Sequence, residues 1–163
     1  MNTLILLSGG WRSLNLLIRW LRTHSEKVAV LHCQLGDGID NDRDRGYAAA
    51  MSHIAQTFPD RVQWYDSTFA HIYPAKTDPR EILRFHVEQF RKLSGVEVRK
   101  ILVPVACGLG KAETVIDQSI TDALVEIPVS VFGRLMTCQK AILPCEKCPA
   151  CIEIATARAQ MGR

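Results

Sequence analysis

The sequence has no apolar run that approaches the length of a membrane span, and its net charge is only +3 with histidine neutral. A helix that crosses a bilayer needs about 20 apolar residues, so we expect no membrane partner. So weak a positive charge is compatible with anionic ligands but does not predict a nucleic-acid-binding surface. The chain also lacks internal repeats, low-complexity tracts and any clear linker, which argues against an array of small modules.

What remains is an ordinary globular composition. The 163 residues are 47% apolar, which excludes a disordered chain and fits one domain, residues 1–163, with a sizeable core. The segment Met1 to Leu7 has no basic region before its apolar residues, so we expect a first strand there and not a signal peptide. These features predict a cytoplasmic protein. In that compartment, six cysteines indicate metal binding or catalysis in preference to disulfides.

Short apolar runs alternate with segments of helical periodicity. Strands are predicted at residues 3–7, 28–33, 61–66, 101–106 and 127–132. Helices are predicted at residues 14–21, 45–57, 79–93, 111–124 and 152–161, the third of them opening on Asp78-Pro79. A strand-helix-strand start implies parallel pairing with a right-handed crossover. The pattern as a whole predicts an α/β fold, a three-layer sandwich with a mostly parallel sheet.

A glycine turn, Ser8 to Ser13, lies between the first predicted strand and the first helix. Gly9 and Gly10 let the backbone turn tightly, and the two serines offer hydroxyl donors. Ligands of open α/β sheets bind beyond the carboxyl ends of the strands, and helix N-termini attract anions. Phosphate or pyrophosphate is the expected ligand; the alternative is an ordinary turn with a serine cap. A Walker P-loop is excluded, because the Gly-Lys-Ser/Thr ending is absent.

A cysteine cluster lies near the other end of the chain. Three thiols stand at x2, x2 spacing, and a fourth lies a short loop upstream: Cys138, Cys145, Cys148 and Cys151. Turns of this size direct thiolates at one centre, and four cysteines leave no open coordination position, so a structural zinc ion is predicted. The alternatives are an iron–sulfur cluster and simple packing of small apolar groups. We expect Cys33 and Cys107 to be core residues.

These features together resemble the PP-loop ATP pyrophosphatase superfamily, whose fold is the HUP-like, adenine nucleotide alpha hydrolase type. Within it, the chain is most similar to the 7-cyano-7-deazaguanine synthase (QueC-type) family of queuosine biosynthesis. The family opens with Ser-Gly-Gly-x-Asp-Ser, and this chain has Ser8-Gly9-Gly10-Trp11-Arg12-Ser13. The family ends with Cys and then Cys-x-x-Cys-x-Ala/Ser-Cys, and the matching residues are Cys138 and Cys145-Glu146-Lys147-Cys148-Pro149-Ala150-Cys151. Its strand with proline and its Lys-x-Glu helix start match Val103-Pro104-Val105 and Lys111-Ala112-Glu113.

The resemblance implies an activity. The family binds ATP with magnesium, activates a carboxylate as an acyl-adenylate, releases pyrophosphate and lets an ammonia-derived nitrogen displace AMP. Its product is a nitrile on a deazapurine base. The residues implied to hold the pyrophosphate are Ser8, Gly9, Gly10 and Ser13. Lys111 is the implied catalytic cation at the phosphates, with a solvated lysine at a helix start as the alternative. Glu113 is expected to cap or pair within its own helix turn. A homodimer is also implied.

The chain departs from the family at two places. Arg12 stands where the family has Asp, which reverses the charge of the loop; an arginine can hold a phosphate but repels magnesium. Trp11 adds bulk beside it. The middle of the chain is short, where relatives carry much of the base-binding surface, so a partner chain from the same operon is one possible source of the missing surface. Two hypotheses therefore stand: an ATP-dependent adenylating ligase acting on a 7-deazaguanine-type or other carboxylate, and a degenerate member that binds a nucleotide or a partner protein without catalysis.

The polar segment Gly36 to Arg45 is predicted to be a loop. It offers Arg43 or Arg45 for contact with phosphate or substrate. Its carboxylates offer a cation site instead: Asp37, Asp40, Asp42 and Asp44. The third alternative is a solvated loop with balanced charge.

Overall fold

The computed structural model describes residues 2–33, 40–67, 78–135 and 145–162. Its elements follow in the order β1 (Thr3–Leu6), α1 (Trp11–Thr23), β2 (Val28–Cys33), α2 (Asp40–Thr57), β3 (Val62–Ser67), α3 (Pro79–Leu93), β4 (Lys100–Val103), β5 (Glu113–Val115), α4 (Ile120–Glu126), α5 (Val129–Phe132) and α6 (Pro149–Gln160). All five strands pair in parallel, in the order β3-β2-β1-β4-β5. The predicted α/β class and parallel sheet are confirmed.

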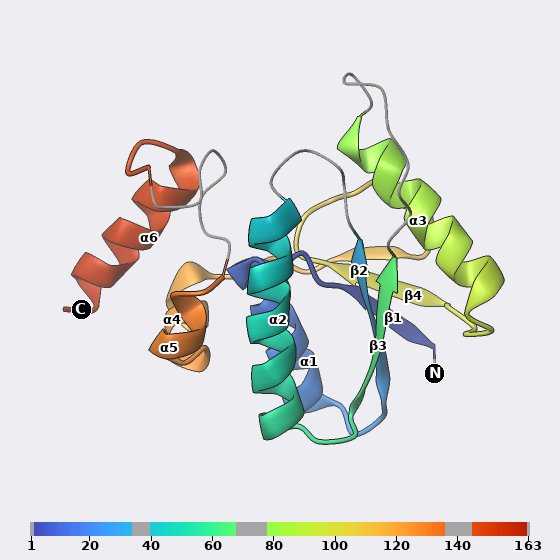
Figure 1. The fold of residues 1–163 in the computed structure, drawn as a ribbon. Coiled ribbons are helices and arrows are strands. Elements are labelled where there is room, and N and C mark those ends of the chain that lie inside the picture. Colours follow the sequence, from blue (N-terminus) through green and yellow to red (C-terminus); the bar gives the residue numbers. More distant parts are fainter. Residues whose placement is uncertain (1, 34–39, 68–77, 136–144, 163) are drawn as a thin grey trace.

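Helices cover both faces of the sheet (Figure 1). Ile5 and Leu7 face one core, which α1, α2, α4, α5 and α6 complete. Leu4 and Leu6 face a second core, which α3 closes with Val87 and other apolar residues. Both alternating faces of β1 are therefore buried, and this explains why its sequence is apolar without interruption. The result is three layers: helices, sheet, helix.

Strand order reverses beside β1. The chain runs from β1 through β2 to β3 on one side, and β4 and β5 lie on the other. In open parallel sheets, this switch point leaves a crevice outside the carboxyl ends of the two central strands, where ligands bind. The Ser8–Ser13 turn follows β1 directly, so it lies at the switch point.

The expected helix over residues 111–124 is wrong in its first half. Residues Glu113–Val115 form β5, and α4 begins only at Ile120, where the Ser119 hydroxyl accepts a hydrogen bond from the Asp122 amide at 3.4 Å. The β-branched run Thr114-Val115-Ile116 favours a strand. Gly108 and Gly110, both at positive φ, reverse the chain so that this run can pair with β4.

Two further boundaries differ from expectation, both at a proline. The predicted strand over residues 101–106 ends at Val103, since Pro104 has no N–H for a central strand ladder. The predicted strand over 127–132 is the short helix α5, which Pro128 opens. The Pro128 carbonyl accepts the amides of Val131 and Phe132, and the Phe132 ring is buried in the first core.

The segment predicted as a loop from Gly36 to Arg45 is helical from Asp40 onward, because α2 begins there. Acidic residues at the start of a helix stabilise it, because their charge complements the helix dipole. The prediction of a loop did not take this effect into account. Residues 36–39 lie outside the described residues. Among the helices that the structure describes, none combines the length and apolar character needed to cross a membrane.

Candidate functional site

The first candidate site is the Ser8–Ser13 turn, which we call the anion bend. Gly9 adopts φ +78°, a left-handed conformation that glycine tolerates best, and Gly10 is the extended N-cap of α1. No side chain caps the first turn of α1, and no acidic residue lies in it. The N-terminus of a 13-residue helix therefore presents its amides and positive dipole end at the switch point.

The two serines of the anion bend hold its shape. The Ser13 hydroxyl donates to the Gly10 carbonyl at 3.0 Å and accepts from the Ser8 amide at 3.2 Å. The two hydroxyl oxygens are themselves 3.2 Å apart, and the Gly10 amide lies 3.4 Å from the Ser8 oxygen. Ser13 is buried and Ser8 is exposed, so Ser13 supports the loop while Ser8 is open to a ligand.

The side chains of Trp11 and Arg12 both have partners outside the anion bend. Trp11 is 3% exposed and belongs to the first core. Arg12 lies over the Trp11 ring, 4.5 Å from its centroid, and its Nη2 donates to the Glu153 carboxylate of α6 at 2.7 Å. The guanidinium is thus paired with a carboxylate of α6 and stacked on the Trp11 ring.

Lys111 is placed at the other edge of the sheet. Glu113 pairs with Ile101, and Ile101 pairs with Leu4, all in parallel. Lys111 precedes β5 and is exposed at the amino edge, whereas Ser8 follows β1 at the carboxyl edge. The structure therefore does not bring Lys111 to the anion bend, and the lysine opens no helix there.

Glu113 holds a loop together. Its two carboxylate oxygens accept hydrogen bonds from the backbone amides of Cys107 and Leu109. Both donors lie in the connection from β4 to β5, residues 104–112. Glu113 therefore satisfies buried backbone donors within this crossover, and the expected role inside a helix turn is wrong because the residue starts β5.

The second candidate site is the cysteine cluster. The sulfur atoms of Cys145, Cys148 and Cys151 all lie within 4.8 Å of one another. Zn–S bonds of about 2.3 Å place the sulfurs of a tetrahedral site about 3.8 Å apart, so a modest contraction would bring the three to one metal ion. Cys148 and Cys151 are buried and Cys145 is half-buried. The predicted fourth ligand, Cys138, lies outside the described residues.

Local backbone geometry explains how the three cysteines meet. Glu146 adopts φ +57°, which folds the chain back so that the Cys148 amide lies 3.3 Å from the Cys145 sulfur. Cys148 is then the N-cap of α6, and Pro149 occupies the first turn. Amide hydrogen bonds and the positive end of a helix dipole both favour thiolates, the form that binds metal. The donor set fits zinc.

The two cysteines predicted to be core residues lie in the second apolar cluster. Cys33 is buried at the end of β2, and Cys107 is half-buried beside it. Burial, and then the neighbouring Cys107, raise the pKa of Cys33 from 9.0 to about 12. Both remain thiols at neutral pH and lie outside the metal-binding cluster.

Sequence reasoning missed His32, a buried histidine in an otherwise apolar strand. One ring nitrogen, Nδ1, lies 2.9 Å from the Leu7 carbonyl oxygen, and Nε2 lies 3.0 Å from the Asp44 carboxylate. The signal was present, because a single histidine inside the apolar run Val28–Cys33 has to find polar partners. From the sequence, Asp44 is expected only to be a cation ligand or a solvated residue.

The two arginines of the segment Gly36 to Arg45 were predicted as candidate phosphate contacts. Arg45 is exposed on α2. The side chain of Arg43 lies outside the described residues.

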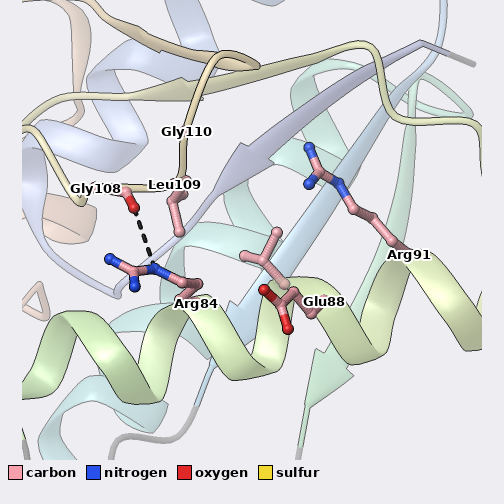
Figure 2. Close-up of a pocket in the computed structure, with 7 residues that line it drawn as sticks. Arg84, Glu88, Arg91, Gly108, Leu109 and Gly110 are labelled. Atoms are coloured by element: carbon pink, nitrogen blue, oxygen red, sulfur yellow. Dashed lines mark hydrogen bonds between the residues drawn. The ribbon is translucent and has the colours of Figure 1, made fainter.

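A hollow of about 320 Å³ lies on the other side of the sheet, between α3 and residues 108–110 (Figure 2). Arg84 and Arg91 flank it, and Glu88 stands between them along the helix (Figure 2). The Arg84 Nε donates to the Gly108 carbonyl at 3.3 Å. None of the residues selected from the sequence as a candidate ligand or catalyst lines this hollow, and its opposite charges stand on an exposed helix face.

The described geometry defines a class of protein. It is an α/β protein with an open, all-parallel sheet and an uncapped helix N-terminus at the switch point of that sheet. It also carries a cysteine cluster able to bind a metal ion. No protein-family model matches the chain, and no curated protein matches it significantly.

Proposed function

We propose that the chain binds a nucleotide such as ATP, with its phosphates at the anion bend. The observation that carries this proposal is the uncapped N-terminus of α1 at the switch point, with Gly9 at positive φ and no carboxylate in the first turn. The amides in the first turn of a helix have no acceptor within the helix and favour an anion, and the exposed Ser8 hydroxyl adds a donor.

In its enzymatic form, the proposal is a PP-loop, QueC-like ATP pyrophosphatase and ligase. A substrate carboxylate of the 7-deazaguanine type attacks the α-phosphorus of ATP; the new O–P bond forms while the bond to the bridging oxygen breaks, and its electrons leave with pyrophosphate. The amides at the bend, with Ser8, would stabilise that departing charge. An ammonia-derived nitrogen then displaces AMP from the acyl-adenylate. Magnesium, when bound, supplies charge neutralisation at the phosphates.

A second candidate is nucleotide binding without turnover. It is favoured by Arg12, which stands where the family has an acidic residue and whose guanidinium is already paired with Glu153. It is also favoured by Lys111, which lies at the opposite edge of the sheet and is not included in the proposed site. In both candidates the cysteine cluster, completed by Cys138, is a structural zinc site of a cytoplasmic protein.

One assay separates the two candidates. Pyrophosphate release is measured with ATP, magnesium and 7-deazaguanine carboxylates for the wild-type chain and for Arg12→Asp. Release by the wild type supports the enzyme. Release only by Arg12→Asp eliminates catalysis by the natural chain and supports a degenerate member. The matched control is Arg19→Asp, which makes the same charge change on α1 at a residue paired with Asp122 at 3.6 Å.

Calorimetric titration with ATP tests the part that both candidates share. Heat of binding, together with a rise in melting temperature, is expected for the wild type. The absence of both would count against the anion bend as a nucleotide site, whatever the substrate.

A further inference from the structure

The His32 ring is held between Leu7, which precedes the anion bend, and Asp44 on α2. It is 3% exposed, at the carboxyl half of β2. Its Nδ1 lies 2.9 Å from the carbonyl oxygen of Leu7, and its Nε2 lies 3.0 Å from the carboxylate of Asp44 on α2. The ring also stacks on Tyr47, with centroids 4.2 Å apart and planes 8° from parallel.

Both polar partners of the ring are acceptors. A backbone carbonyl has no proton to donate, and neither has an ionised carboxylate. A neutral imidazole donates from one nitrogen only, so the lone pair of its second nitrogen would face an acceptor oxygen. An imidazolium donates from both nitrogens and satisfies both contacts. The geometry therefore fits a positively charged His32.

The neighbouring groups are compatible with that charge. Burial, and then the Asp66 carboxylate, raise the pKa of Tyr47, so its phenol stays neutral against the ring. A neutral aromatic face is a favourable neighbour for a cation. Asp66 itself stands opposite His32 in the register of β2 and β3. Asp44 and Asp66 thus place two carboxylates near the ring.

The hydrogen bond between His32 and Leu7 is linked to the anion bend through one planar peptide group. The peptide group between Leu7 and Ser8 is planar, so fixing its oxygen also fixes the direction of its N–H. That N–H, on Ser8, donates to the Ser13 hydroxyl, which in turn donates to the Gly10 carbonyl. His32 therefore lies at the base of the hydrogen-bond chain that shapes the bend.

We infer that His32, held as an imidazolium by Asp44, is a positioning residue that fixes the Leu7–Ser8 peptide of the anion bend. The inference rests on the proposed function, because the ligand that benefits is the phosphate group at that bend. His32 itself touches no phosphate. It acts by keeping the bend in the conformation that binds one.

The state of the ring can be observed without any ligand. Nitrogen-15 NMR of the full chain at neutral pH reports whether each imidazole nitrogen carries a proton, and His32→Phe assigns the signal by removing it. Protons on both nitrogens are expected. In Asp44→Asn the amide can donate to Nε2, so the ring should become neutral with its proton retained on Nδ1. A proton on only one nitrogen of the wild-type ring overturns the imidazolium state, and a ring without a proton on Nδ1 donates nothing to Leu7 and overturns the positioning role as well.

Binding of inorganic pyrophosphate, measured by calorimetry, tests the positioning role. His32→Phe keeps the ring volume and the stacking on Tyr47 but donates no hydrogen bond, and we expect about tenfold weaker binding, the size of one lost charge-assisted bond. Asp44→Asn should bind with intermediate affinity, because its neutral ring still donates to Leu7 from Nδ1 but without charge assistance. The matched control is His86→Phe, since His86 is fully buried and bonds Ser67 at 2.6 Å on the opposite face of the sheet.

The outcomes separate the inference from the proposed function. Pyrophosphate binding that falls in His32→Phe and not in His86→Phe supports a positioning role, because both variants lose a buried histidine. Equal affinity in the two variants overturns that role while leaving the anion site intact. A wild-type chain that does not bind pyrophosphate overturns the anion site itself, and the inference with it.

Discussion

The guanidinium of Arg12 donates to the carboxylate of Glu153 at 2.7 Å, across 141 positions of sequence. Arg12 lies in the first turn of α1, within the anion bend, and Glu153 lies on α6, two residues beyond Cys151. About a third of each side chain is exposed, at 34% and 36%. This ion pair therefore joins the candidate nucleotide site to the helix that carries the cysteine cluster.

Glu153→Gln should release Arg12 from its carboxylate partner. The freed guanidinium can then turn toward the bend and offer a bidentate contact to phosphate. We expect metal-free pyrophosphate to bind a few-fold more tightly by calorimetry, with little change in stability because half-exposed ion pairs contribute roughly 0–1 kcal/mol. Glu126→Gln is the control, since it removes the partner of Arg22, another arginine of α1. Unchanged affinity in Glu153→Gln would mean that Arg12 cannot reach the site.

Purified chain should contain one zinc ion per molecule by elemental analysis. Cys145→Ser should lose the metal and lower the melting temperature, because binding energy at a structural zinc site is folding energy. Cys107→Ser is the matched control: its thiol is half-buried, like that of Cys145, but belongs to the second apolar cluster. A metal-free chain, or one with iron and visible absorbance, would contradict a zinc site.

The chain should lose stability in alkali through Cys33. Its thiol ionises near pH 9 when unfolded but, because burial and then Cys107 raise its pKa, only near pH 12 when folded. The stabilisation is complete below pH 9. Above that value the free energy of unfolding should fall by about 1.4 kcal/mol per pH unit from this group, until folded Cys33 also ionises near pH 12. Urea unfolding at a series of pH values should show a shallower fall for Cys33→Ala; an identical slope would refute the assignment.

The sequence was sufficient to predict features that depend on local pattern. The apolar run Val28–Cys33 matches β2 residue for residue, and Asp78-Pro79 opens α3 with the Asp78 carboxylate accepting the Arg80 amide at 2.9 Å. The spacing of the three C-terminal cysteines was enough to predict that their sulfurs meet. In each case the interaction is set by residues close together in the chain.

Features that depend on distant partners were not predictable. Lys111 to Glu113 resembles a helix start, but pairing with β4 makes its last residue the start of a strand. The sequence predicts effects of Arg12 on phosphate and magnesium alone, because no neighbouring residue indicates that Glu153 is its partner. The contacts of His32 were not predicted for the same reason, since its partners come from other elements. Cys138 lies outside the described residues, so its place in the zinc site remains a prediction.

Binding of nucleotide phosphates by the anion bend is tested most directly by a pair of glycine variants. Gly9 and Gly95 both adopt positive φ, at +78° and +68°, but Gly95 lies in the connection between α3 and β4. Replacement by alanine should lower stability at both positions, by about 1 kcal/mol from the positive φ alone and by more at Gly9, which is buried whereas Gly95 is exposed. In a calorimetric titration with ATP, Gly9→Ala should bind at least about tenfold more weakly than the wild type, the scale of a lost charged hydrogen bond, while Gly95→Ala binds normally. Equal ATP affinity in the two variants would contradict nucleotide binding at the anion bend.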